Sequence, residues 1–269
     1  EELDIKLETS FVYDSKGNQI AMFTGSESMD RELVFYKDTP EYLRQAFVSI
    51  EDERFFEHSG IDLRRIGSAI FGFIVNRGNV AHGGSTITQQ VVRNITGKDR
   101  VSLDRKVQEQ WLAIQLEKRL DKWQILELYM NVIYMGNSCY GVQSASKLYF
   151  NKDVKDLSLA ECALLAGITN SPGTYNPFTE KGRENVIKRQ KIILRKMLNL
   201  EKINQNEYDE ALLEELKFAE KGDSKREVPV QSYFVDYVVN EVTKDLMEQK
   251  GMSKQMALTT IYNYGLRIH

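Results

Sequence analysis

The sequence of 269 residues has few cysteines, few prolines and no long hydrophobic run. Its two cysteines, Cys139 and Cys162, are too few for a disulfide framework, and their spacing fits no metal-binding pattern. We expect both to be small buried side chains. No run of 18 apolar residues occurs, and Glu1 and Glu2 do not begin a signal peptide. What is left is a chain long enough to bury a core without cross-links.

The sequence also lacks an excess of positive charge. Its 36 Lys and Arg residues against 39 Asp and Glu give a net charge of −3, so we expect no nucleic-acid partner. One segment differs from this average, because residues 84–122 hold eight Lys or Arg against five Asp or Glu. An anionic ligand is expected to bind at this locally basic segment.

Hydrophobic periodicity predicts a mainly helical protein. Two short strands are indicated at 11–13 and 19–23, around a turn. Thr39 and Pro40 begin a helix, with Leu43, Ala46, Phe47 and Ile50 on its apolar face. Between 40 and 216 we find no convincing strand. Further helix starts are predicted at Asp62, Ser85, Ser102, Asp121 and Ser158, and an amphipathic pattern runs over 186–197.

The C-terminal part has a different composition. Residues 220–229 are charged and carry helix breakers, as in an exposed connector. A helix is predicted over 231–249, and a β-prone tail over 259–262. The predicted units are an N-terminal strand and linker segment (1–38), a helical domain (39–219) and a C-terminal linker (220–269). Because the tail stops at His269 without a turn or cap, we expect the natural chain to continue.

The first candidate for chemistry is Glu51, at the end of the helix that begins at Pro40. It lies four residues after Phe47, at the edge of the apolar face and near the negative helix terminus. Burial and the helix dipole both disfavour the charged carboxylate there, as a general base requires. From this segment alone, a solvated glutamate at a helix end is an equally open interpretation.

The second candidate is the segment from Gly83 to Gln90, where two glycines precede the hydroxyl-rich start of a helix. Free backbone amides and the positive dipole end attract phosphate at such a place. The Lys of a P-loop is absent. Taken alone, an ordinary helix N-cap at Ser85 explains the segment as well.

The third candidate is the group Arg105, Lys106 and Glu109. On a helix, Arg105 and Glu109 are four residues apart and share a face, so a surface ion pair is the simplest interpretation. An anion site formed with the hydroxyl-rich helix start is the alternative. His58 and His82 have no partners at metal-ligand spacing.

The most hydrophobic stretch runs from Ile66 to Val75, with Arg64, Arg65 and Arg77 around it. Ten helical residues are too short to cross a bilayer but long enough to lie at its surface. The stretch is either a core helix or a membrane-contacting segment in which Phe71, Phe73 and Ile74 insert.

Taken in order, these segments resemble the five motifs of peptidoglycan glycosyltransferases. The matching segments are Glu51-Asp52-x-x-Phe55-x-x-His58-x-Gly60, Gly84 to Gln90, Arg105-Lys106-x-x-Glu109, Ile125-Leu126-Glu127-x-Tyr129-x-Asn131 and Arg189 to Leu194. In addition, Val12-Tyr13-Asp14-x-x-Gly17 resembles the first strand of bifunctional class A penicillin-binding proteins. The tail from Tyr233 resembles the linker to their transpeptidase domain.

The resemblance implies a mainly α, lysozyme-like fold with two lobes, and a small β element formed by the N- and C-terminal segments. It implies polymerisation of lipid II into β-1,4 glycan strands, with inversion and release of undecaprenyl diphosphate. It also implies an extracytoplasmic location at the outer face of the cytoplasmic membrane. An N-terminal anchor helix and a transpeptidase domain are expected in the full-length chain.

Site residues follow by position in the motifs. Glu51 matches the catalytic base and Glu109 the second acidic residue. Arg93 stands where lysine is expected, and its fork-shaped guanidinium binds phosphate differently. No cofactor is required, although a divalent cation (Mg²⁺ or Mn²⁺) could assist. The residues that match substrate-binding positions are Phe55, Ser85, Thr86, Gln89, Gln90, Arg93, Arg100, Arg105 and Lys106.

Two other functions fit parts of the sequence. A lysozyme-like muramidase also uses a glutamic acid, but cutting glycan requires no diphosphate site, whereas this chain places cations beside a phosphate-type helix start. A non-catalytic helical module that docks on membranes through residues 66–75 would show no turnover at all.

Overall fold

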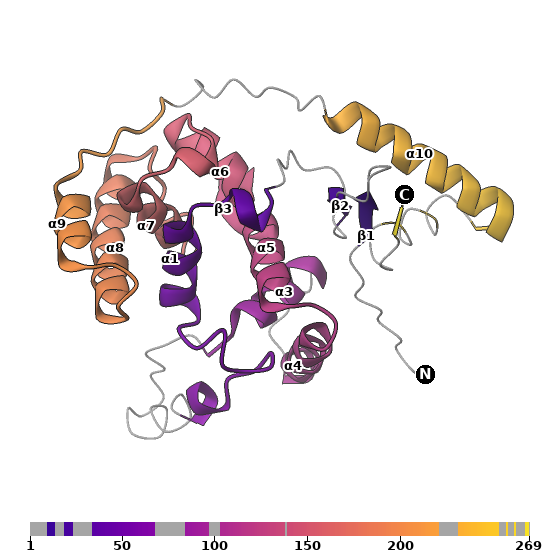
Figure 1. Cartoon of the computed structure of the whole chain (residues 1–269), viewed down its shortest axis with the longest axis horizontal. Coiled ribbons are helices and arrows are strands. Elements are labelled where there is room, and N and C mark those ends of the chain that lie inside the picture. Colours follow the sequence, from indigo (N-terminus) through magenta and orange to yellow (C-terminus); the bar gives the residue numbers. More distant parts are fainter. Residues whose placement is uncertain are drawn as a thin grey trace.

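A computed structural model describes most of the chain, and it is mainly helical (Figure 1). The described residues are 10–13, 19–23, 34–67, 84–96, 103–137, 139–220, 231–252, 257, 261 and 267–268. Residues 63–67 are helical, and α10 (Gln231–Lys250) lies apart from the main helical body (Figure 1). The body contains α1 (Glu41–Glu51), α3 (Ile87–Thr96), α4 (Leu103–Glu117), α5 (Lys122–Val132), α6 (Val142–Phe150), α7 (Leu159–Ile168), α8 (Glu180–Asn199) and α9 (Gln205–Leu213).

The predicted β element of the N- and C-terminal segments is confirmed. Strand β1 (Ser10–Tyr13) pairs antiparallel with β2 (Gln19–Phe23) and parallel with β5 (Arg267–Ile268), giving the order β2-β1-β5. The prediction of a β tail at 259–262 was wrong. The tail strand lies six residues beyond Ile261, which is itself helical and buried.

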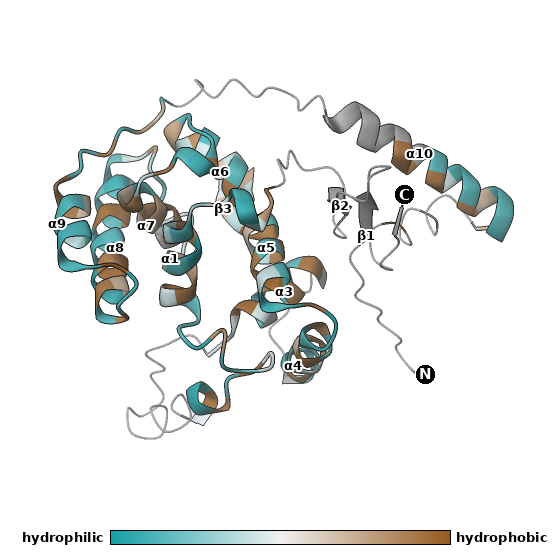
Figure 2. Cartoon of the chain, in the orientation of Figure 1, coloured by the Kyte–Doolittle hydropathy of each residue, from teal (hydrophilic) through white to brown (hydrophobic). Residues whose placement is uncertain are grey.

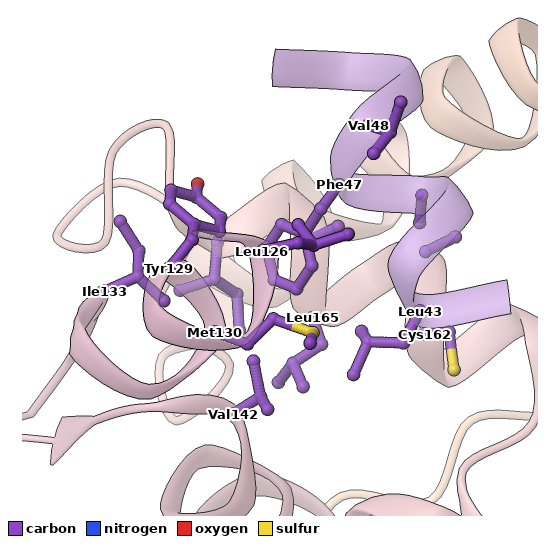
Figure 3. Close-up of a cluster of buried hydrophobic side chains, with 14 of the residues drawn as sticks. Leu43, Phe47, Val48, Leu126, Tyr129, Met130, Ile133, Val142, Cys162 and Leu165 are labelled. Carbon is purple, nitrogen blue, oxygen red and sulfur yellow. The ribbon is translucent and has the colours of Figure 1, made fainter. Parts of the chain in front are cut away.

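The hydrophobic core lies where α1, α5, α6 and α7 meet (Figure 3). Phe47 of α1 packs edge-on against Tyr129 of α5, with ring centroids 5.4 Å apart. All ten residues of α7 are buried, whereas α8 alternates hydrophobic and hydrophilic residues because one of its faces meets solvent (Figure 2). Each fully buried Leu or Phe contributes roughly 1.5–3 kcal/mol. The core therefore holds the helices that carry Glu51 and its neighbours rigidly in place.

Side chains at the helix starts explain where several helices begin. Ser158 and Glu161 form the predicted capping box of α7, at 3.0 and 3.1 Å. The predicted start of α5 is confirmed too, because Gln124 accepts a hydrogen bond of 2.9 Å from the Asp121 N–H. Cys139 and Cys162 are both buried and unbridged, as expected.

Two helices and a hairpin were not predicted. Helices α6 and α9 were missed, and a hairpin of β3 (Tyr134–Gly136) and β4 (Cys139–Tyr140) interrupts the region expected to be free of strands. These strands are too short to show a period of two residues. After α9 the chain returns to α6, where the Ala219 N–H donates 2.8 Å to the carbonyl of Tyr149.

Other expectations lie largely outside the described residues. These are the connector predicted at 220–229, of which only residue 220 is described, and nearly all of the hydrophobic stretch, including Phe71, Phe73 and Ile74. Within the described part of the chain, no helix is both long and apolar enough to cross a membrane.

Candidate active site

The Glu51 carboxylate is held by side chains from two other helices. Gln90 of α3 donates a hydrogen bond of 2.8 Å from Nε2 to Glu51 Oε2. Thr169, at the end of α7, lies 3.3 Å from Glu51 Oε1 through its hydroxyl. Arg65 donates to the Glu51 carbonyl at 2.5 Å, so the last turn of α1 is fixed as well. The glutamate is half-buried, and it is therefore both oriented and accessible.

Asp52, the next residue, joins the end of α1 to the start of α3. Its carboxylate is 1% exposed, and Oδ2 accepts hydrogen bonds from the Ile87 N–H at 3.0 Å and from His58 Nε2 at 2.9 Å. His58 Nδ1 accepts from the Gly60 N–H at 3.2 Å, which places the imidazole hydrogen on Nε2. This network sets the position of Glu51 relative to Gln90.

The start of α3 differs from the prediction. Thr86, not Ser85, is the capping residue: Gln89 accepts from the Thr86 N–H at 2.9 Å, and Thr86 Oγ1 accepts from the Gln89 N–H at 3.1 Å. Both side chains are buried, so direct substrate contact by Thr86 and Gln89 does not fit the structure. Because the amides of Ile87 and Gln89 already have acceptors, the expected phosphate cradle of free backbone amides is also not formed.

Phe55 is likewise a supporting residue rather than a surface one. Its side chain is fully buried, and the Lys122 ammonium lies 4.4 Å from the ring centroid. A cation over an aromatic face is favourable. In the structure Phe55 packs the loop after α1, and its contact with substrate stays a prediction.

A cationic group lies along α4. Lys106 Nζ donates to Ser85 Oγ at 2.8 Å and to Glu109 Oε1 at 2.5 Å. Arg105 also approaches Glu109, with 3.8 Å between its NH1 and Oε2. Glu109 is only 4% exposed. The carboxylate is thus paired with cations, as expected, although Lys106 rather than Arg105 is the nearer partner.

Arg105 of α4 and Arg93 of α3 border the same small cavity. A cavity of about 20 Å³, enough for one water molecule, is bordered by Val92, Arg93, Thr96, Arg105, Gln108, Glu109 and Leu112. Gln90, which holds Glu51, lies three residues before Arg93 and shares its helix face. Helix α3 therefore carries both the partner of Glu51 and one of the cations, and it packs against both α4 and α5 (Figure 1). Arg100, predicted to join this group, lies outside the described residues.

Two residues near Glu51 were not predicted as part of the site. Thr169 is 118 positions from Glu51 in sequence, and no motif marks it. Tyr129 lies in a segment that its apolar spacing presents as core. Burial raises the pKa of its hydroxyl, and the Glu51 carboxylate raises it further. Both therefore belong to the surroundings of Glu51.

In the described ranges, no three His, Cys, Asp or Glu side chains gather as they would around a metal ion. The assistance of Mg²⁺ or Mn²⁺ stays a prediction. The chemistry available at this site is that of a positioned carboxylate beside paired cations.

Comparison with known proteins identifies the family. The family model described as transglycosylase matches residues 16–198. This chain belongs to the transglycosylase family. The match includes Glu51, Gln90, Arg93, Lys106 and Glu109, so the site described above lies within the matched region.

Curated relatives extend this result over nearly the whole chain. The transglycosylase chain is 40% identical over 272 residues to "Penicillin-binding protein 1A" of Clostridium botulinum, covering 97% of this chain and 32% of that protein. It is 42% identical over 278 residues to the protein of the same name from Clostridium tetani, covering 97% and 34%. The chain therefore spans about a third of the length of these relatives.

A crystal structure of penicillin-binding protein 1A from Haemophilus influenzae also aligns with it. The TM-score is 0.43 at 22% identity, with 97% of this chain and 26% of that chain covered.

Proposed function

We propose that this chain is a peptidoglycan glycosyltransferase that polymerises lipid II into β-1,4 glycan strands. The observation that carries the proposal is the position of two residues on α3. Gln90 orients the Glu51 carboxylate, and one turn later Arg93 borders a cavity together with Arg105 of α4. Family membership supports the same reaction. A muramidase would have no use for the cations.

In the proposed reaction, Glu51 takes the proton from the 4-hydroxyl of the acceptor sugar. The hydroxyl oxygen attacks C1 of the donor sugar from the face opposite the diphosphate. The bond from C1 to the phosphate oxygen breaks with inversion, and undecaprenyl diphosphate leaves with the electron pair. Because a diphosphate leaves as an anion, it requires stabilisation of charge more than a proton. Arg93, Arg105 and Lys106 supply that positive charge.

Glu109 has a positioning role in this proposal. A free carboxylate near a diphosphate would repel it, but Glu109 is paired with Lys106 at 2.5 Å and lies beside Arg105. It holds the two long side chains in place before substrate arrives, which reduces the entropy lost on binding. Ser85 contributes to the same arrangement through Lys106.

The test is to incubate the purified protein with labelled lipid II and to measure polymer. We expect polymer from the wild type, and a rate about 10²- to 10⁴-fold lower for Glu51→Gln, the usual contribution of a general base. Glu53→Gln is the matched control, because Glu53 is exposed and pairs with Lys196 at 3.1 Å. Near wild-type polymerisation by Glu51→Gln would remove the assignment. Cleavage of preformed glycan without polymerisation would indicate a muramidase.

We also propose that one face of the protein meets the outer leaflet of the cytoplasmic membrane, where the lipid-linked substrate lies. Leu63 is 71% exposed, and Val107 and Trp111 of α4 are 65% and 56% exposed. A groove of about 490 Å³ is bordered by both Leu63 and Ile114. Ile114 lies three residues after Trp111 and seven after Val107, on the same face of α4, which links these residues to the groove. Exposed apolar groups of this kind mark interaction surfaces.

The membrane proposal is tested by flotation with liposomes. Leu63→Glu combined with Trp111→Glu should reduce binding, whereas Leu213→Glu, at an 86% exposed position of α9, should not. Equal binding by both variants would contradict the proposal. An N-terminal anchor and a transpeptidase domain in the full-length protein are further parts of the proposed function, in keeping with relatives about three times as long as this chain.

A further inference from the structure

The Tyr129 hydroxyl is a buried polar group that the proposed mechanism does not use. Tyr129 is fully buried, and its hydroxyl has no hydrogen-bond partner of good geometry in the part of the chain that the structure describes. The ring packs in the core, but the hydroxyl points away from the hydrophobic cluster (Figure 3). It approaches Thr169, with Glu51 nearby. A buried hydroxyl without a partner is costly, so its retention beside Glu51 requires a reason.

Thr169 has one hydroxyl hydrogen and two acceptors. Its Oγ1 lies 2.9 Å from the carbonyl of Ala166 and 3.3 Å from Glu51 Oε1. A hydroxyl donates to one acceptor at a time and can accept on its lone pairs. Thr169 can therefore turn its hydrogen toward Glu51 when the glutamate is charged, and toward Ala166 when it is not.

We propose that Tyr129 and Thr169 form a switchable hydrogen-bond chain that positions Glu51 and sets its basicity. With Glu51 ionised, the Tyr129 O–H turns to Thr169 Oγ1 and forms a hydrogen bond that the structure does not yet contain, and Thr169 donates to Glu51 Oε1. When Glu51 takes the proton of the acceptor sugar, Thr169 turns its hydrogen to the Ala166 carbonyl, and the new carboxyl O–H donates to Thr169 Oγ1. Each hydroxyl keeps its own proton throughout. The inference rests on the proposed function, because it assigns Glu51 as the base.

The charged groups around Glu51 are held by contacts that do not involve the proposed hydrogen-bond chain. Arg93 faces the site from α3, and Arg65 donates to the Glu51 carbonyl. Asp52 is held by His58 and the start of α3. None of these contacts involves the Tyr129 or Thr169 hydroxyl. Removing either hydroxyl therefore leaves the surrounding charges in place, and a change in the pH profile reports on the chain itself.

The experiment measures kcat/KM for glycan polymerisation against pH in Tyr129→Phe and Thr169→Val. Donors to the charged carboxylate favour ionisation, so their loss should move the acidic limb of the profile to higher pH. One hydrogen bond corresponds to a shift of roughly half to one pH unit. Thr169→Val should shift the limb at least as far as Tyr129→Phe, and Thr169→Ser should restore the wild-type profile.

Tyr149→Phe is the matched control. It also removes a fully buried tyrosine hydroxyl, which donates 2.7 Å to the Met135 carbonyl, away from Glu51. We expect this variant to unfold at lower temperature with an unchanged pH profile. If Tyr129→Phe and Thr169→Val also keep the wild-type profile, the hydrogen-bond chain is refuted.

Two failures are distinguishable. If Glu51→Gln keeps wild-type activity, the proposed base is wrong. If Glu51→Gln is inactive but the hydroxyl variants keep the wild-type profile, only the hydrogen-bond chain is wrong. Thermal unfolding shows whether each variant folds. If Tyr129→Phe does not fold, the pH profiles of Thr169→Val and Thr169→Ser decide whether the hydrogen-bond chain exists.

Discussion

The Asp52 carboxylate accepts a hydrogen bond of 3.0 Å from the backbone N–H of Ile87, 35 residues later in the chain. This contact fastens the end of α1 to the first turn of α3. Glu51 is next to Asp52 in sequence and Gln90 lies three residues after Ile87, and the distance from Gln90 Nε2 to Glu51 Oε2 is 2.8 Å. The geometry of the proposed base is thus set by its neighbour in sequence.

Replacing Asp52 should therefore affect both stability and activity. Asp52→Ala leaves the Ile87 N–H and the His58 N–H without an acceptor, and each buried unpaired donor costs about 1–3 kcal/mol. We expect the free energy of unfolding in urea to fall by roughly 2–4 kcal/mol, and polymerisation to fall as well. Glu53→Ala, which breaks one exposed ion pair, should cost under about 1 kcal/mol. Equal stability of the two variants would contradict the account.

The cap of α3 provides a second test. Thr86→Ala removes the hydroxyl that accepts from the Gln89 N–H and donates 2.6 Å to the Gly60 carbonyl. We expect a loss of about 0.5–2 kcal/mol in thermal or urea unfolding. Ser85→Ala should change stability by under about 0.5 kcal/mol, because Ser85 caps nothing. A larger loss of stability in Ser85→Ala than in Thr86→Ala would show that Ser85 is the capping residue after all.

Gly60 should tolerate no side chain. Its φ is +93°, and a Cβ there would lie 2.7 Å from the backbone carbonyl of Ala113 in α4. Gly60→Ala should lower the free energy of unfolding by at least about 1–3 kcal/mol, the cost of such backbone strain. Gly173→Ala is the control, since a Cβ at Gly173 would meet nothing within 4 Å. Similar melting temperatures for both variants would refute this prediction.

The contact between α1 and α9 should depend on pH. The Tyr42 hydroxyl donates 2.5 Å to Glu207, and this bond, with the Asn204 N–H, holds the pKa of Glu207 below its ordinary value of 4.5. A depressed acid pKa stabilises the fold above the ordinary value, and the stabilisation is lost as the pH falls through the folded value. Tyr42→Phe should therefore lower the melting temperature most at neutral pH. If the difference in melting temperature between Tyr42→Phe and the wild type grew as the pH was lowered, the prediction would be contradicted.

Much of the helical architecture could be predicted because its signals are local. The apolar spacing of α1 and the Ser158–Glu161 box of α7 are complete within a few residues, and both predictions are confirmed. The start of α3 was misassigned by one residue, because Ser85 and Thr86 are both good caps in sequence. The spacing of Thr86 and Gln89 is that of a capping box and distinguishes them locally, and the contact of Thr86 with Gly60, 26 residues away, adds to it. The β3–β4 hairpin depends on similarly distant packing, since Gly136 lies against Pro172.

In the candidate site, too, some features could be predicted from local sequence and others depend on long-range packing. Glu51, Gln90 and the cations of α4 could be proposed from motifs, and the structure brings their helices together. Phe55 and Gln89 were assigned to substrate by their positions in the motifs, and their burial could not be inferred from those motifs. The proposed roles of Tyr129 and Thr169 depend on the orientation of their hydroxyl groups, which cannot be predicted from the sequence.

The internal use of the first amides of α3 has a consequence for substrate capture. A cradle of rigid backbone amides would hold a diphosphate by short, directional hydrogen bonds. In the proposed mechanism the attraction depends instead on guanidinium and ammonium groups, whose fields are screened over about 10 Å at 0.1 M ionic strength. Affinity for the lipid-linked donor should therefore decline steeply as sodium chloride is added.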